Sequence, residues 1–160
     1  MGRTLSFLLI HLLVLAVATN STSIHELLKS NGLPPGLFPK SVVKSYDLND
    51  DGLLQVYLER PCLTKFETRV FYDKVVRANL TYGRLIGLEG LTQEELFLWL
   101  PVKDIIVYNP DSGLILFDIG VAHKQMSLSL FEDPPLCHSQ SNWMWVDESL
   151  GIEIGSQGQR

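Results

Sequence analysis

The sequence lacks the patterns that mark the common classes of hydrolase, nucleotide-binding protein and nucleic-acid-binding protein. It has no Gly-x-Ser-x-Gly motif and no glycine loop for phosphate, so a nucleophile elbow and nucleotide chemistry have no support. Lysine and arginine together number 13 against 18 acidic residues, and they form no run. The formal net charge of −5 argues against nucleic acid and anionic membrane surfaces as electrostatic partners. A dispersed serine-histidine-aspartate triad stays open, because its members can come from any chain order.

Cysteine is scarce, and the histidines are scattered. In an oxidising compartment the even cysteine count favours a disulfide between Cys62 and Cys137, and two free buried thiols are the alternative. Closing so long a loop is worth roughly 4 to 5 kcal/mol in the chain-entropy picture. Beyond residue 18, His25, His123 and His138 form no close-spaced pair, so we expect no metal site and no cofactor.

The longest apolar stretch is too short to span a bilayer. Leu5 to Val17 is nearly all apolar and is soon followed by polar residues, whereas a transmembrane helix needs about 20 apolar residues. Arg3 before this stretch and the small residues in Ala16-Val17-Ala18 are typical of a secretory signal peptide. We therefore predict a signal peptide over residues 1–18, no transmembrane anchor, and a protein that is secreted or held in an endomembrane lumen.

The rest of the chain is long enough for one domain and too short for two of ordinary size. After Cys137 the composition turns polar and then rich in glycine and glutamine, which is typical of a segment outside a domain. We therefore predict one domain over residues 19–137 and a flexible C-terminal tail over residues 138–160.

A short helix is predicted at the start of this domain. Ser23 and Glu26 have the spacing of a capping box, in which each side chain accepts from the other residue's backbone N–H. The helix should end at Asn31-Gly32, because glycine is favoured just past a helix end and the prolines that follow cannot continue it.

From Val42 onward, short extended runs alternate with turn residues, which is typical of an antiparallel sheet. The predicted strands are 42–48, 53–58, 66–72, 74–80, 95–100, 103–108, 114–121 and 125–130. In the last of these, Met126, Leu128 and Leu130 should point to one face. The fold class predicted is mainly β, an antiparallel β-barrel-like domain with one short N-terminal helix.

The segment Asp47 to Gly52 can be read in two ways. It supplies oxygen ligands at the first, third and fifth positions of a calcium loop and glycine at the sixth. The twelfth position, where a bidentate glutamate should close the coordination sphere, is Leu58. We therefore predict a hairpin turn at Asn49 to Gly52, with glycine where a positive φ is needed.

Two predicted strands are apolar on both faces and must be covered on both sides. One contains Leu96-Phe97-Leu98-Trp99-Leu100 and the other Leu114-Ile115-Leu116-Phe117. A packed core is one explanation, and an apolar cavity inside a barrel is the other. If there is a cavity, the residues predicted to line it are Leu96, Leu98, Leu100, Ile115 and Phe117.

Export would expose two sequons to glycosylation. One starts at Asn20, next to the predicted cleavage site, and the other is Asn79-Leu80-Thr81, beside the predicted turn at Tyr82-Gly83. We predict Asn79 as the glycosylated residue.

Several segments, taken in order, carry a family resemblance. They are 33–39, 49–52 with 58–62, 71–74, 80–83, 95–102, 117–122 and 130–137. With these segments the chain resembles the plant family catalogued as domain of unknown function 538. The resemblance implies a β-barrel-like fold with an N-terminal helix and, in a plant, the apoplast as the extracellular site. Some members have been proposed to resemble the lipid-binding barrels of bactericidal permeability-increasing proteins and to hydrolyse chlorophyll esters. The family has no agreed catalytic motif, so the resemblance implies no catalytic residue here.

Three functional hypotheses follow from the sequence. The first is a secreted, disulfide-closed domain that binds an apolar small molecule or a lipid. The second is an esterase of the chlorophyll-hydrolysing kind, for which His123 is the candidate base. The third is a non-catalytic domain of the apoplast that binds protein partners, through its acidic surface and the tail around Trp143-Met144-Trp145.

Overall fold

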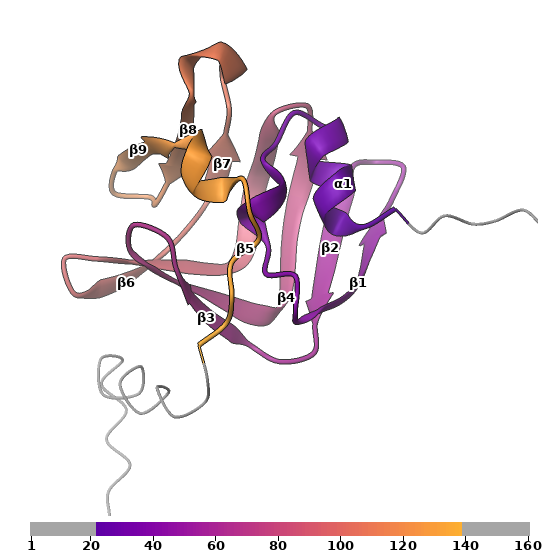
Figure 1. Cartoon of the computed structure of the whole chain (residues 1–160), viewed down its shortest axis with the longest axis horizontal. Helices are drawn as coiled ribbons and strands as arrows, with labels where there is room; N and C mark the ends of the chain where they lie inside the picture. The colour runs from indigo at the N-terminus through magenta and orange to yellow at the C-terminus, as the bar shows by residue number, and fades with distance from the viewer. Residues whose placement is uncertain (1–21, 139–160) are drawn as a thin grey trace, which may run out of the picture.

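The computed structural model describes residues 22–138, and one antiparallel sheet dominates this part of the chain (Figure 1). The nine strands are β1 (Val43–Leu48), β2 (Leu53–Leu58), β3 (Cys62–Lys65), β4 (Arg69–Thr81), β5 (Arg84–Glu95), β6 (Leu98–Pro101), β7 (Asp104–Ile106), β8 (Leu114–Asp118) and β9 (His123–Ser127). The helical elements are α1 (Ile24–Ser30) and three 3-10 turns, η1 (Pro35–Leu37), η2 (Pro110–Ser112) and η3 (Leu128–Phe131).

The sheet is open rather than closed into a barrel. Its strand order is β1-β2-β4-β5-β7-β8-β9, with β3 added beside β4 and β6 added beside β5. No pairing within residues 22–138 joins β1 to β9 at the two ends of this order. The mainly β, antiparallel fold with a short N-terminal helix is therefore confirmed, whereas closure of a barrel is not observed.

Local chemistry explains the start of the domain. The Ser23 side chain accepts from the Glu26 N–H at 3.2 Å, and Glu26 accepts from the Ser23 N–H at 3.0 Å, so the predicted capping box is confirmed. Ile24 and Leu28 on one face of α1 are buried in the core together with residues of the sheet. The helix therefore covers part of the sheet rather than extending away from it.

The β1–β2 connection is a hairpin turn, as predicted. The Gly52 N–H donates to the Asn49 carbonyl, the Asn49 side chain accepts from the Leu53 N–H, and Gly52 has a φ of 86°. Residues 22–138 contain no group of three or more His, Cys, Asp or Glu residues that could hold a metal ion.

The longest strands differ from the sequence prediction. The predicted strands 66–72 and 74–80 fall in one continuous strand, β4, except for residues 66–68, which precede it, and residues 84–94 of its partner β5 were not predicted as a strand. Gly87 and Gly90 interrupt the alternation of β5, and the β4–β5 register shifts near them. Gly90 has a φ of 83°, and a Cβ there would collide with the Val75 carbonyl oxygen. Gly90, which helped to hide this strand from pattern analysis, is thus the residue that lets it cross close to β4.

The last predicted strand ends early. β9 stops at Ser127, whose side chain caps η3 by accepting from the Ser129 N–H. Leu128 and Leu130 therefore leave the strand face on which we placed them, and Leu130 is exposed. Leu128 still packs partly buried against the core, and Phe131 is fully buried there. The Phe131 ring lies 5.4 Å from the Phe117 ring and 4.5 Å from the Phe66 ring, centroid to centroid.

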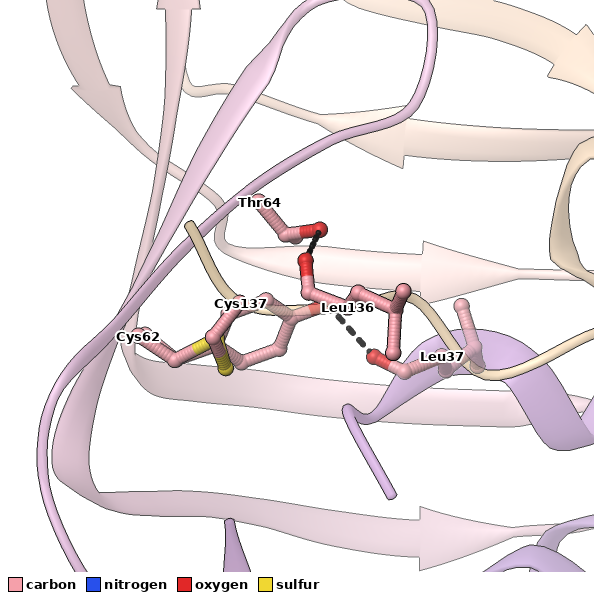
Figure 2. The surroundings of a disulfide bond; sticks show 6 residues. Leu37, Cys62, Thr64, Leu136 and Cys137 are labelled. Atoms are coloured by element: carbon pink, nitrogen blue, oxygen red, sulfur yellow. Dashed lines mark hydrogen bonds between the residues drawn. A yellow bond between two sulfur atoms is a disulfide. The ribbon is translucent and has the colours of Figure 1, made fainter. Parts of the chain in front are cut away.

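A disulfide joins Cys62 in β3 to Cys137, 75 positions later, as predicted (Figure 2). Beside it the Thr64 hydroxyl donates to the Leu136 carbonyl at 2.8 Å, and the His138 N–H donates to the Leu63 carbonyl at 2.8 Å. The disulfide and these two hydrogen bonds hold the segment after η3 against the edge of β3.

Two predicted segments lie outside the described residues: the signal peptide and the tail with Trp143-Met144-Trp145. Within residues 22–138, none of the helices has the length and apolar character needed to cross a membrane.

Candidate functional site

The structure does not bring the five predicted lining residues together. Ile115 and Phe117 lie in β8, are each 1% exposed and pack in the core. Leu100 in β6 is partly buried against the same core. Leu96 and Leu98 point away from it, with exposed fractions of 82% and 62%. These five side chains therefore do not line one internal cavity.

The exposed leucines belong to a tight hairpin where we predicted a continuous strand over residues 95–100. β5 ends at Glu95, β6 begins at Leu98, and these two residues are paired across the turn. Leu96 and Phe97 are therefore the two residues of the turn, with φ values of 49° and 67°. Two-residue turns with positive φ at both positions match the twist of a hairpin and strongly favour Asn-Gly or similar pairs.

We call Leu96, Phe97 and Leu98 the apolar tip. Phe97 is 88% exposed, so three large apolar side chains follow one another in solvent. Leucine and phenylalanine are poor residues for this turn, because a left-handed backbone conformation costs a residue with a Cβ about 1–2 kcal/mol. Strain of this kind is more often kept at functional positions than elsewhere. Both the exposure and the backbone thus indicate that the tip has a role other than stabilising the fold.

Charged and aromatic groups fix the base of the apolar tip. The Arg69 guanidinium in β4 donates two hydrogen bonds to the Glu94 carboxylate in β5 and lies 5.5 Å from the centroid of the Trp99 ring in β6. The hydrogen bond from Arg69 lowers the pKa of Glu94, and the same bond raises the pKa of Arg69. Three neighbouring strands are therefore tied together directly beneath the exposed turn.

A surface groove of about 450 Å³ lies beside the apolar tip. It is lined by Lys65, Glu67, Thr68, Arg69, Glu94, Leu96 and Phe97. The groove therefore runs between the β3–β4 turn and the β5–β6 turn, and the apolar tip forms part of its wall. Glu67 is exposed and its carboxylate lies 3.9 Å from the Lys124 ammonium, which is also 3.0 Å from Glu95.

His123, the candidate base, lies at the start of β9 and far from a hydrolase arrangement. Its Nε2 is 3.3 Å from Oδ2 of Asp118, and its side chain is 66% exposed. No hydrogen bond within residues 22–138 joins His123 to a serine or threonine hydroxyl. In the described part of the chain the pair therefore supplies a base and a neighbouring carboxylate, and no hydroxyl is bonded to the base as a triad nucleophile would be.

Asn79, the predicted glycosylation site, lies near the end of β4 and is exposed. Its amide nitrogen has one long contact of 3.5 Å, to the Asp51 carbonyl. The side chain is therefore accessible, and its glycosylation stays a prediction.

Sequence reasoning found two residues of the apolar tip and missed the third. It placed Leu96 and Leu98 on one face of a strand and so assigned Phe97 to the opposite face. The feature of the sequence that could have indicated a hairpin is the run of five apolar residues between Glu94-Glu95 and Pro101. The turn takes the first two residues of this segment, Leu96 and Phe97.

The comparison with protein families gives one match. The model of the family described as "Protein of unknown function, DUF538" matches residues 24–132, from α1 to the end of η3. The match covers more than half of the chain and includes the apolar tip, whereas Cys137 lies just beyond it. No curated protein has a significant match to the sequence.

Proposed function

The chain belongs to the DUF538 family, and we propose that its domain binds lipid bilayers through the apolar tip of the β5–β6 hairpin. The observation that carries this proposal is the strained, exposed turn at Leu96 and Phe97. The proposal keeps lipid as the ligand but moves the binding site from the interior to the surface. Ile115 and Phe117, which we had expected beside a ligand, are instead part of the packed support.

The energetics favour weak, reversible attachment. Moving an exposed leucine or phenylalanine side chain out of water is worth roughly 1.5–3 kcal/mol, and the tip offers three such side chains. Part of this gain is offset by the loss of freedom on association. The result resembles a single acyl anchor, which binds membranes only marginally. Trp99 adds a ring close to the tip, and tryptophan is favoured where apolar and wet regions meet.

The glycosylation and secretion hypotheses fit this role. Asn79 lies ten positions after Arg69 along β4, which places it roughly 30 Å from the base of the tip at ordinary strand rise. A glycan there would leave the apolar tip free. The predicted signal peptide over residues 1–18 and the Cys62–Cys137 disulfide support a membrane surface outside the cytosol as the place of action.

The test is vesicle binding by the glycosylated mature protein, with a variant in the tip. We expect Phe97→Asp to reduce co-sedimentation with phosphatidylcholine vesicles at least tenfold, because a charged group must then leave water. Tyr82→Ser is the matched control, since Tyr82 is 75% exposed in the two-residue turn at the other end of β5. Equal vesicle binding by wild type and Phe97→Asp, or no binding by wild type, would contradict the proposal.

The esterase hypothesis is tested separately. It needs a hydroxyl nucleophile within reach of His123, and Asp118 supplies only the orienting carboxylate. Loss of chlorophyll-ester turnover in His123→Ala would support it over a purely binding role. Unchanged turnover in that variant would remove His123 as the candidate base.

A further inference from the structure

We propose that the groove beside the apolar tip binds a zwitterionic phospholipid headgroup, phosphocholine, while the tip lies among the acyl chains. This inference rests on the proposed function, because it assumes that the tip inserts into a bilayer. It adds a headgroup preference that the apolar tip alone would not provide.

Position is the first argument. Leu96 and Phe97 belong both to the tip and to the wall of the groove. If these side chains enter the boundary of the hydrocarbon region, the polar part of the groove lies at the depth of the headgroups, since these form a layer several ångströms thick outside the hydrocarbon core. The groove of about 450 Å³ is large enough for one headgroup.

Charge balance is the second argument. Two cations, Lys65 and Arg69, and two carboxylates, Glu67 and Glu94, line the groove. Arg69 and Glu94 are engaged with each other. Lys65 is exposed and makes no ion pair within residues 22–138, and Glu67 keeps 57% of its side chain exposed and forms a long ion pair of 3.9 Å with Lys124. One unpaired cation and one weakly paired carboxylate therefore face a ligand that carries one charge of each sign.

The chemistry assigns a role to each group. The Lys65 ammonium and the Thr68 hydroxyl are donors suited to the phosphate oxygens. The Glu67 carboxylate suits the quaternary ammonium, which has no N–H to donate and is bound by charge alone. An anionic headgroup would lack a partner for Glu67 and would meet a chain with net charge −5. The groove thus favours phosphocholine over an acidic lipid.

The experiment compares three vesicles of equal size. Their lipids are phosphatidylcholine, phosphatidylglycerol and an uncharged galactosyl diacylglycerol. Because exposed ion pairs are individually weak, we expect wild type to bind phosphatidylcholine about three- to tenfold more tightly than either of the others. Tighter binding to phosphatidylglycerol, or equal binding to all three, would overturn the inference.

Two variants separate this inference from the proposed function. In Lys65→Gln/Glu67→Gln, which keeps the net charge, we expect the phosphatidylcholine preference to disappear while binding to the uncharged lipid stays at the wild-type level. Phe97→Asp should lose binding to all three vesicles. An unchanged preference in the double variant would refute the headgroup site alone, whereas no vesicle binding by wild type would refute the tip itself.

A second readout avoids dependence on vesicles. Titration with glycerophosphocholine should shift the backbone amide resonances of residues 65–68 in wild type and leave those of Tyr82 and Gly83 in place. The same titration of Lys65→Gln/Glu67→Gln should show no such shifts. Shifts of equal size in both proteins would contradict the assignment of Lys65 and Glu67.

Discussion

The chain contains two short segments of nearly the same apolar character, one of which is largely buried while the other is largely exposed. Leu114–Phe117 forms most of β8, which pairs with β7 on one side and β9 on the other. Leu96–Leu100 turns back on itself, and within residues 22–138 its strand β6 pairs with β5 alone. Ile115 and Phe117 are buried, whereas Leu96 and Leu98 are exposed. Apolar composition therefore does not decide burial; the number of neighbouring elements does.

The difference also lies in what covers each segment. Phe131 of η3 stacks on Phe117, and the disulfide at Cys137 holds the chain after η3 against β3. Nothing comparable covers the apolar tip within residues 22–138. Leu114–Phe117 thus contributes to stability, whereas the side chains of the apolar tip are exposed to contact something outside the domain.

The largest effect should come from truncating the buried member of the comparison. We expect Phe117→Ala to lower the free energy of unfolding by about 3–5 kcal/mol, since it removes a buried ring and leaves a cavity against Phe131. Phe97→Ala, the matched exposed change, should lower it by less than about 0.5 kcal/mol. Chemical denaturation of the two variants checks this, and similar losses in both would break the comparison.

Removing the disulfide should have the next largest effect. We expect Cys62→Ser/Cys137→Ser to cost about 2–5 kcal/mol of unfolding free energy. Hydrogen exchange should increase around η3 and β3, which the bond connects, while the apolar tip keeps its wild-type binding to vesicles. Loss of vesicle binding in a folded double variant would show that the two regions are coupled rather than independent.

The apolar tip should become more stable when its residues suit its backbone. Leu96→Asn/Phe97→Gly places a favoured pair in a turn with two positive φ values. We expect a gain of about 1–2 kcal/mol in unfolding free energy, because strain at both positions is relieved, together with loss of vesicle binding. Thermal unfolding and co-sedimentation of one sample measure both. A lower unfolding free energy in this variant would mean that Leu96 and Phe97 stabilise the fold, contrary to the role proposed for them.

The sequence predicts the features of this structure that are set by contacts between residues close together in the chain, and it misses those set by contacts with distant residues. The capping box at Ser23 and the hairpin turn at Gly52 were predictable because neighbouring residues satisfy each other's backbone groups. The disulfide followed from the cysteine count. β5 was missed because the positive φ of Gly90 makes sense only beside Val75, which lies on another strand. The turn at Leu96 was missed because leucine and phenylalanine disfavour the positive φ values that this turn requires. Prediction from local residue preferences therefore places the turn elsewhere.

The smallest effect concerns the base of the apolar tip and depends on pH. The pKa of Glu94 is lowered from its ordinary value of 4.5 by the hydrogen bond from Arg69. A carboxyl group with a lowered pKa in the folded state adds stability above its ordinary pKa, and this contribution is lost as the pH falls through the folded value.

We therefore expect Glu94→Gln to cost less than about 1 kcal/mol at pH 7, because both side chains of the pair are partly exposed. The difference from wild type should shrink as the pH falls below 4.5 and through the lowered pKa of Glu94 in the folded state. Urea denaturation at several pH values below and above 4.5 measures this, with Glu89→Gln as the control, since Glu89 also lies on β5 but shows no ion pair within residues 22–138. A cost that stays the same at every pH would mean that the charge of Glu94 does not supply the stabilisation at the base of the apolar tip.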